Sequence, residues 1–479
     1  MICRLRPRVC CSLSSLRITS NHLISQPGVQ VLLLLLTFLS LYTLYGYYFF
    51  YRDPLSIFFS EEHGFDRFYS AVRQAEADHF INSIYTEPQI AGLRLGKAGD
   101  NPEICAVFIT VGRSMEGRQY IDTAVGAFLA NMSRLEREAI HLKLFFADVP
   151  DPSTQHASYE NLIAADIADD IITYPATLPS TTKDHKIKTL VTWASDRRNK
   201  HALERKTIHD YAYALAQCAH TTDAPYIALF EGDILLADGW AARTLKNLRT
   251  IEKMMAEPTR RDPARGRVEP GRPNSWLYLR LFNQERSTGW AGGTGFRENH
   301  VHIIAMAVGL PLLLVLTLLR KFILPRRWGQ YLDRWVLLLV CGVAVPLFVW
   351  LFYASGKASI LGAPRGVREE FFGCCNQALV YNKAHALALS DFLMAMTVRQ
   401  KPGRSDMLPK DFAWNHGLAR ISAYPMMAQH AGRVSAIDTS NDEAKRVWSM
   451  AFESLEPSKL AQDHMQDVLE VFKSSEVPS

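Results

Sequence analysis

The chain lacks the features that mark several large classes of protein. Lys and Arg are spread along its 479 residues and the net charge is only +5, so no stripe of positive charge indicates nucleic-acid binding. No internal repeat is evident, and repeats are a usual mark of transporters. With 48% hydrophobic and 21% charged residues, the composition excludes a disordered chain and allows about two to three domains.

Charged residues are absent from three long apolar segments. These are residues 29–51, 301–319 and 335–353, and none of them contains Asp, Glu, Lys or Arg. Because a helix needs roughly 20 apolar residues to cross a bilayer, each segment predicts a transmembrane helix. The absence of intramembrane charge argues against a transport pathway.

Two other interpretations apply to these segments. The first could be a signal peptide, but no small-residue cleavage site follows it, and its 23 residues are long for the apolar core of such a peptide. The other two could form a buried helical hairpin of a soluble protein. Two uncharged stretches of 19 residues joined by a polybasic turn favour a membrane hairpin instead.

Acidic residues are missing from the segments that we expect in the cytosol. Residues 1–28 hold four Arg and no Asp or Glu, and residues 320–334 hold five basic residues against the single acid Asp333. Because Lys and Arg are enriched on the cytosolic side of membranes, both segments are predicted to be cytosolic. Residues 52–300 and 354–479 then share the lumenal side, where they can build one domain.

This topology predicts seven parts of the chain. They are a cytosolic tail (1–28), a transmembrane anchor (29–51), the first part of a lumenal domain (52–300), a second transmembrane helix (301–319), a basic cytosolic loop (320–334), a third transmembrane helix (335–353), and the second part of the lumenal domain with a C-terminal tail (354–479). Cys105, Cys218, Cys374 and Cys375 would be lumenal, where disulfides persist. Their spacing does not reveal which of them pair.

Compact apolar runs alternate with helical patterns in the soluble segments. Strands are expected at residues 104–110, 142–146, 170–174 and 226–230, and helices at 119–132 and 200–219. This order predicts an α/β fold with a mostly parallel sheet, in which ligands bind at the C-terminal ends of the strands. An apolar stripe near the C-terminus predicts one amphipathic helix through Leu460, Met465, Leu469 and Phe472.

An acid-x-acid triplet follows the last of these strands. Glu231 and Asp233 are separated by Gly232, which keeps the turn tight. Two carboxylates in this position can bind one hard divalent cation, which would neutralise the phosphates of a nucleotide sugar. Ordinary polar turns also contain such triplets, so the triplet alone leaves both interpretations open.

Six segments resemble a known family of enzymes. They are Asp210–Cys218, Tyr226–Asp233, Gly239-Trp240, Trp276–Phe282, Cys374–Ala378 and Gln429–Gly432. Together they resemble GT-A glycosyltransferases related to N-acetylglucosaminyltransferase IV. The resemblance is closer to the GPI-glycan N-acetylgalactosamine side-chain transferases, the post-GPI-attachment to proteins factor 4 family. In that family an N-terminal anchor precedes a GT-A domain that is split by two membrane spans.

The resemblance implies a set of site residues. Mn²⁺ or another divalent cation would be bound by Glu231, Asp233 and His430. A UDP-sugar donor would contact Thr110, Arg113, Arg205, Lys206, Asp210 and Glu231. A lone His and a surface Arg or Lys are commonly structural, and that interpretation stays open for each of them.

An inverting transfer also needs a carboxylate that takes the proton from the acceptor hydroxyl. Asp406 opens an apolar segment and is our first candidate for this base. Glu285, Glu369 and Glu370 are the alternatives.

The function that the resemblance implies is transfer of N-acetylgalactosamine, or a related hexose, from a UDP-sugar onto a mannose of the GPI-anchor glycan. The acceptor would be a GPI-anchored protein or a GPI glycolipid at the Golgi membrane. Relatives usually have Glu-Asp-Asp where this chain has Gly232 in the middle. This departure keeps open an inactive paralogue or a noncatalytic membrane scaffold. An N-glycan-directed N-acetylglucosaminyltransferase is a further alternative.

Overall fold

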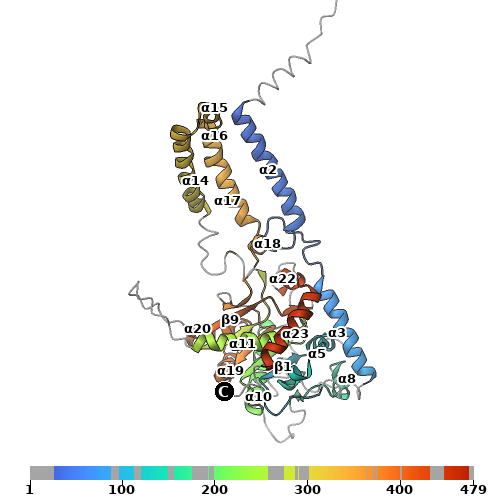
Figure 1. Ribbon diagram of the computed structural model, residues 1–479. Coiled ribbons are helices and arrows are strands. Elements are labelled where there is room, and N and C mark those ends of the chain that lie inside the picture. The colour runs from blue at the N-terminus through green and yellow to red at the C-terminus, as the bar shows by residue number, and fades with distance from the viewer. Residues whose placement is uncertain are drawn as a thin grey trace, which may run out of the picture. The chain divides into compact units, whose positions relative to one another are not determined.

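A computed structural model shows a chain of two compact units. It describes residues 26–87, 96–112, 120–148, 156–174, 193, 199–256, 275–285, 290, 301–362, 364–370, 373, 375–399, 402–431 and 447–473. The first unit comprises Met1–Gly64 and Thr288–Gly362, and the second comprises Phe65–Ser287 and Ala363–Ser479. Both can be followed in Figure 1.

Three helices of the first unit are long and apolar enough to cross a membrane, as expected of a membrane protein. They are Pro27–Phe49, Val301–Ile323 and Arg334–Ala354, each within a few residues of its predicted bounds. The elements of this unit are α2 (Pro27–Phe49), α14 (Val301–Leu318), η1 (Leu319–Ile323), α15 (Arg326–Gly329), η2 (Gln330–Leu332), α16 (Arg334–Leu338), η3 (Leu339–Ala344), α17 (Val345–Ala354) and α18 (Lys357–Ile360).

Helix α2 packs against the hairpin within this unit. The ring of Phe38 meets that of Phe348 edge-on at 4.9 Å between centroids. The hydroxyl of Tyr42 lies 2.7 Å from that of Ser355. Aromatic packing and a hydrogen bond therefore join α2 to the third span and the residue just beyond it.

The second unit is built on an eight-stranded sheet in the order β3-β2-β1-β4-β8-β6-β9-β7. The strands are β1 (Ile104–Thr110), β2 (Ile140–Phe146), β3 (Asp170–Thr173), β4 (Tyr226–Glu231), β6 (Trp276–Arg280), β7 (Gly366–Glu369), β8 (Ala378–Asn382) and β9 (Ala419–Tyr424). Strands β3, β2, β1 and β4 are parallel, as are β6 and β9, whereas β8 is antiparallel to both its neighbours and β7 to β9. The predicted α/β fold with a mostly parallel sheet is confirmed, in mixed form.

Strands from both sides of the membrane hairpin interleave in this sheet. Strand β8, which follows the hairpin in the chain, lies between β4 and β6, which precede it. Without β8, the facing edges of β4 and β6 would have unpaired backbone groups. The residues before and after the hairpin therefore complete one common core.

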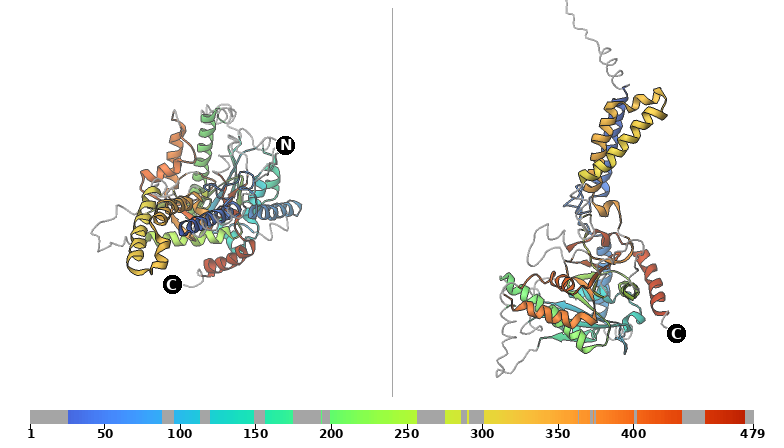
Figure 2. Two further views of the ribbon diagram at one scale, coloured as in Figure 1. Left: turned by 90° about the horizontal axis from the view of Figure 1, so that it is seen from above. Right: turned by 90° about the vertical axis from the view of Figure 1, so that its left-hand side faces the viewer.

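Helices cover both faces of the sheet, as Figure 2 shows from two further directions. They are α3 (Tyr69–Thr86), α5 (Ile121–Leu129), α6 (Arg134–Glu138), α8 (Tyr159–Ala164), α10 (Lys200–Thr221), α11 (Trp240–Ala256), α19 (Lys383–Thr397), α20 (Leu408–Asn415), α22 (Met450–Glu453) and α23 (Pro457–Lys473). Alternate residues of β1 point to opposite faces: Phe108 packs in a core with α3, α5 and α11, and Val107 in one with α10, α19 and α20. A disulfide between Cys105 and Cys218 joins β1 to α10.

The predicted strands and the predicted helix at residues 200–219 are confirmed, with ends shifted by two residues at most. The helix predicted at residues 119–132 is wrong at its C-terminal end, because α5 stops at Leu129 and α6 begins at Arg134. Ser133 caps the start of α6. Its hydroxyl accepts from Glu136 N, and the Glu136 carboxylate accepts from Ser133 N, which is a capping box that starts a new helix.

Candidate metal and ligand site

The acid triplet lies where β4 ends. Glu231 is the last residue of β4, and Gly232 and Asp233 form the turn that follows. Glu231 N donates to Gln377 O at 3.0 Å, and Gly232 N donates to Ile109 O at 3.0 Å. The turn is therefore held between β1 and the residues that lead into β8.

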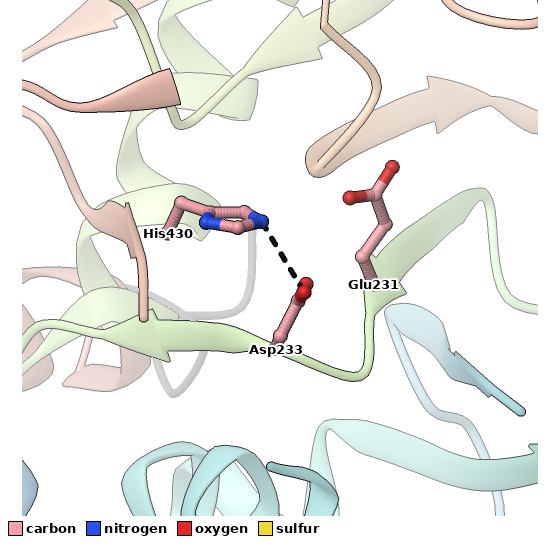
Figure 3. Close-up of side chains that lie close together, drawn as sticks. All are labelled: Glu231, Asp233 and His430. Carbon is pink, nitrogen blue, oxygen red and sulfur yellow. Dashed lines mark ion pairs between the residues drawn. The ribbon is translucent and has the colours of Figure 1, made fainter. Parts of the chain in front are cut away.

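A second, two-stranded sheet brings His430 to this turn. Strand β5 (Ile234–Leu236) pairs antiparallel with β10 (Ala428–His430), and the register places His430 opposite Ile234, the neighbour of Asp233. Nε2 of His430 lies 3.2 Å from Oδ2 of Asp233, as the dashed line in Figure 3 shows. The pairing of β5 with β10 thus places the His430 imidazole beside the acid triplet.

The three predicted metal ligands come together. Each of Glu231, Asp233 and His430 offers one ligand atom, and these atoms lie within 4.8 Å of one another. All three side chains are half-buried. Two carboxylate oxygens and one imidazole nitrogen are a donor set that suits Mn²⁺ and similar divalent cations, so the residues present fit such an ion.

The carboxylates of this site repel each other. Burial, followed by the charge of Asp233, raises the pKa of Glu231 to about 7, while His430 and a hydrogen bond from Tyr211 oppose the rise. A bound cation would favour the ionised carboxylates and reverse this effect. Binding of a cation at pH 7 or below would therefore release protons.

Tyr211 on α10 contacts the site through its hydroxyl. Its hydroxyl donates to Oε1 of Glu231 at 2.8 Å and lies 3.2 Å from Asn376 O. Burial raises the pKa of Tyr211 well above its ordinary value, so the hydroxyl stays protonated. Sequence patterns assign no role to Tyr211, because this contact depends on how α10 packs against β4.

A cavity of about 220 Å³ adjoins the acid triplet. Its walls are the end of β1, the start of α5, one face of α10 and the triplet itself. Thr110, Lys206 and Asp210, which the resemblance assigns to donor binding, line this cavity together with Glu231 and Asp233. The cavity lies at the C-terminal ends of parallel strands, where ligands of open α/β sheets bind.

Lys206 and Asp210 form a buried ion pair in the cavity wall. Nζ of Lys206 lies 2.6 Å and 2.8 Å from the two carboxylate oxygens of Asp210, and 2.8 Å from Ala147 O. Tyr174 donates to the same carboxylate at 2.6 Å. The ammonium group has three N–H donors and makes three hydrogen bonds, so a phosphate would have to displace one of them.

Arg205, another predicted cationic contact, does not line the cavity. The guanidinium of Arg205 donates to the carbonyl oxygens of Thr397 and Arg399 at the C-terminal end of α19. Arg113 lies outside the described residues. The described cavity wall then has three carboxylates and the single ammonium of Lys206, a formal charge of −2 when all are ionised. Such a wall repels a phosphate unless a cation is bound as well.

Gly232 allows the triplet to approach β1 closely. A Cβ atom at this position would lie 3.0 Å from the hydroxyl oxygen of Thr110 and 3.1 Å from its Cβ. The Thr110 hydroxyl is itself 2.9 Å from Nε2 of His156. The middle Asp of the proteins that this chain resembles would therefore require Thr110 to shift by a few tenths of an ångström.

Asp406, the first candidate for the base, does not line the cavity either, but its charge acts on Glu231 of the triplet. Arg404 holds both of its oxygens, with Nε 3.1 Å from Oδ1 and Nη2 2.8 Å from Oδ2. Its negative charge contributes to the raised pKa of Glu231. The amide of Asn376 donates to Ser405 O at 2.7 Å and anchors the loop that contains Asp406.

Two of the alternative bases are bound in structural contacts. Glu285 accepts from the Ser449 hydroxyl at 2.9 Å and from Ala451 N at 3.0 Å, at the start of α22. Glu370 is buried and paired with Arg280 at 2.8 Å. Neither lines the cavity, and their catalytic roles stay predictions, as does that of Glu369, the exposed last residue of β7.

Comparisons with known proteins do not place the chain. A scan against protein-family models finds no match, and a search of curated proteins finds none either.

Proposed function

We propose that this chain is a metal-dependent glycosyltransferase that moves N-acetylgalactosamine, or a related hexose, from a UDP-sugar onto a mannose of a GPI-anchor glycan. The proposal rests mainly on the convergence of Glu231, Asp233 and His430 beside a cavity at the C-terminal edge of parallel strands. The segments that resemble GT-A glycosyltransferases support the same assignment. The membrane would be that of the Golgi, with a cytosolic N-terminus.

The charge of the cavity supports a metal-dependent donor site. With Lys206 bound to Asp210, no described cation of the wall is available to a diphosphate. Glu231, Asp233 and His430 would hold the divalent cation, and the cation would neutralise the diphosphate and stabilise it as a leaving group. The anionic wall therefore needs a bound cation before it can accept a diphosphate, and the three ligands would hold that cation.

The transfer itself exchanges one bond at the anomeric carbon. The acceptor hydroxyl oxygen attacks this carbon, and the bond from the carbon to the diphosphate oxygen breaks, with UDP taking the electron pair. The hydroxyl proton passes to the Asp406 carboxylate. Arg404 fixes the orientation of this carboxylate, because it binds both of its oxygens. Attack opposite to the leaving group inverts the configuration of the sugar.

The insertion of a membrane hairpin supports a lipid-linked acceptor. A soluble acceptor would require only a tether, which α2 already provides. The hairpin is inserted within the chain that forms the sheet, because β6 precedes it and β7 follows it. An acceptor sugar held near the lipid would meet the domain at a high effective concentration.

The test uses the full-length protein, purified in detergent, with UDP-N-acetylgalactosamine and a GPI glycolipid. We expect the glycolipid to gain the mass of one N-acetylhexosamine when Mn²⁺ is present. Excess EDTA should abolish the gain, and added Mn²⁺ should restore it. Mass spectrometry of the glycolipid is the measurement.

Each alternative function predicts a different result in the same assay. Transfer to an N-glycan acceptor but not to the GPI glycolipid would favour the N-glycan-directed enzyme. A folded protein that shows no Mn²⁺-dependent binding of any UDP-sugar would be a scaffold or an inactive paralogue, and the proposal would be wrong.

A further inference from the structure

The carboxylate of Glu231 has one hydrogen-bonding partner among the described side chains, and this is Tyr211. We propose that Tyr211 is a positioning residue of the metal site, whose hydroxyl holds one oxygen of Glu231 so that the other faces the cation. The inference rests on the proposed function, since it requires that the site binds a divalent cation.

The geometry directs the Tyr211 proton to Glu231. Two acceptors lie within reach of the hydroxyl, Oε1 of Glu231 at 2.8 Å and Asn376 O at 3.2 Å. An ionised carboxylate is the stronger acceptor and is also the nearer one. With Oε1 engaged, rotation of the carboxylate would break this bond. The side chain therefore keeps one orientation, which lowers the entropy loss when a cation binds.

Helix α10 is held on both sides of Tyr211. Five residues before it, Lys206 Nζ donates to Ala147 O, just after β2. Seven residues after it, Cys218 forms the disulfide with Cys105 of β1. Seven residues make about two helical turns, so Cys218 and Tyr211 share a face of the helix. These two attachments set the position of the Tyr211 hydroxyl relative to the ends of the strands.

The same helix offers a matched control. Tyr213 lies two residues farther along α10 and is half-buried, and its ring contacts those of Phe145 and Tyr174. In the described part of the chain its hydroxyl makes no hydrogen bond. Tyr213→Phe therefore removes the same atom from the same helix without a change at Glu231.

The experiment measures Mn²⁺ affinity of the full-length protein in detergent, without any sugar donor. Electron paramagnetic resonance follows the signal of unbound Mn²⁺ for the parent protein, Tyr211→Phe, Tyr213→Phe, Glu231→Gln and the double variant Tyr211→Phe/Glu231→Gln. We expect Tyr211→Phe to weaken Mn²⁺ binding by about 10- to 100-fold, because partners of metal ligands typically contribute this much. Tyr213→Phe should bind like the parent protein.

The double variant separates positioning from a structural role. If Tyr211 acts through Glu231, Tyr211→Phe should cause no further loss of affinity in the Glu231→Gln background. Equal Mn²⁺ affinity of the parent protein and Tyr211→Phe would overturn the inference and leave the proposed function intact. A double variant that loses affinity by the full factor of Tyr211→Phe, beyond the loss of Glu231→Gln, would have the same meaning. A parent protein that binds no Mn²⁺ would overturn both.

Discussion

Asp233 lines the cavity, whereas Asp406 does not and affects Glu231 through its charge, so their surroundings suit them to different tasks. Asp233 faces His430 at 3.2 Å within a cluster of ligand atoms, whereas Asp406 is paired with Arg404. Asn in place of Asp keeps the size and removes the charge. Replacing each in turn therefore tests which step depends on which carboxylate.

We expect Asp233→Asn to lose both donor binding and transfer, because the amide no longer attracts a cation. The transfer rate should fall by about 100- to 1000-fold. Calorimetry should show that Mn²⁺-dependent binding of UDP falls in parallel. Unchanged activity would remove Asp233 from the site.

Asp406→Asn is the matched contrast. It should retain Mn²⁺ and UDP binding while transfer falls by about 100-fold or more, since a base acts only on the acceptor proton. Transfer at the parent rate would move the role of base to another carboxylate.

At the scale of the element, helix α23 shows how ion pairs can decide which face of a helix is buried. The predicted helix is confirmed, but its predicted apolar stripe is wrong at Met465 and Leu469, which are 65% and 50% exposed. His464 and Asp467 are buried in their place. Asp467 is paired with Arg243 and Lys246 of α11, which satisfies its charge.

His464 is held between two carboxylates. Its Nε2 lies 2.9 Å from Glu136 and its Nδ1 lies 3.3 Å from Asp238. A neutral imidazole has a single N–H, so only the protonated ring can donate to both. Burial alone would lower the pKa of His464, but the hydrogen bonds and charges of Asp238 and Glu136 raise it to about 9.

This pair of contacts predicts a loss of stability at alkaline pH. Because the pKa of His464 in the folded protein is above its ordinary value of 6.5, its contribution is complete below about pH 6.5 and disappears as the pH rises through about 9. We expect this contribution to be about 1–2 kcal/mol, after allowance for solvent screening. The melting temperature should therefore fall between pH 6 and pH 9.5 by more in the parent protein than in His464→Gln. An equal fall in both would contradict the role of His464.

At the scale of the whole molecule, the basic loop between the second and third spans predicts the orientation of the chain. A tag within residues 322–330 should be cytosolic, and a tag after Ser479 should be lumenal. In sealed vesicles, protease should remove the first tag and spare the second. Detergent should make both accessible, which serves as the control. Protection of both tags in sealed vesicles would contradict the topology.

The sequence by itself determined the features that depend on neighbouring residues. Apolarity over about 20 residues is a local property, and it predicted the three spans. The alternation of apolar runs predicted β1 to β4 and helix α10, because burial patterns follow the periods of strands and helices. It also placed Glu231 and Asp233 at the end of β4. His430 entered only through resemblance to a family.

The tertiary structure decided the features that join distant segments. The insertion of β8 between β4 and β6, the pairing of β5 with β10 and the disulfide between Cys105 and Cys218 bring together residues that lie far apart in the chain. The contacts of Lys206 with Asp210 and Ala147 likewise depend on tertiary packing, and its predicted role in donor binding stays a prediction. The physical reason is the same in each case. The periodicity of apolar residues indicates which side of a helix or strand is buried. It does not indicate which distant segment packs against that side, so the partner of a buried side chain is known only from the tertiary structure.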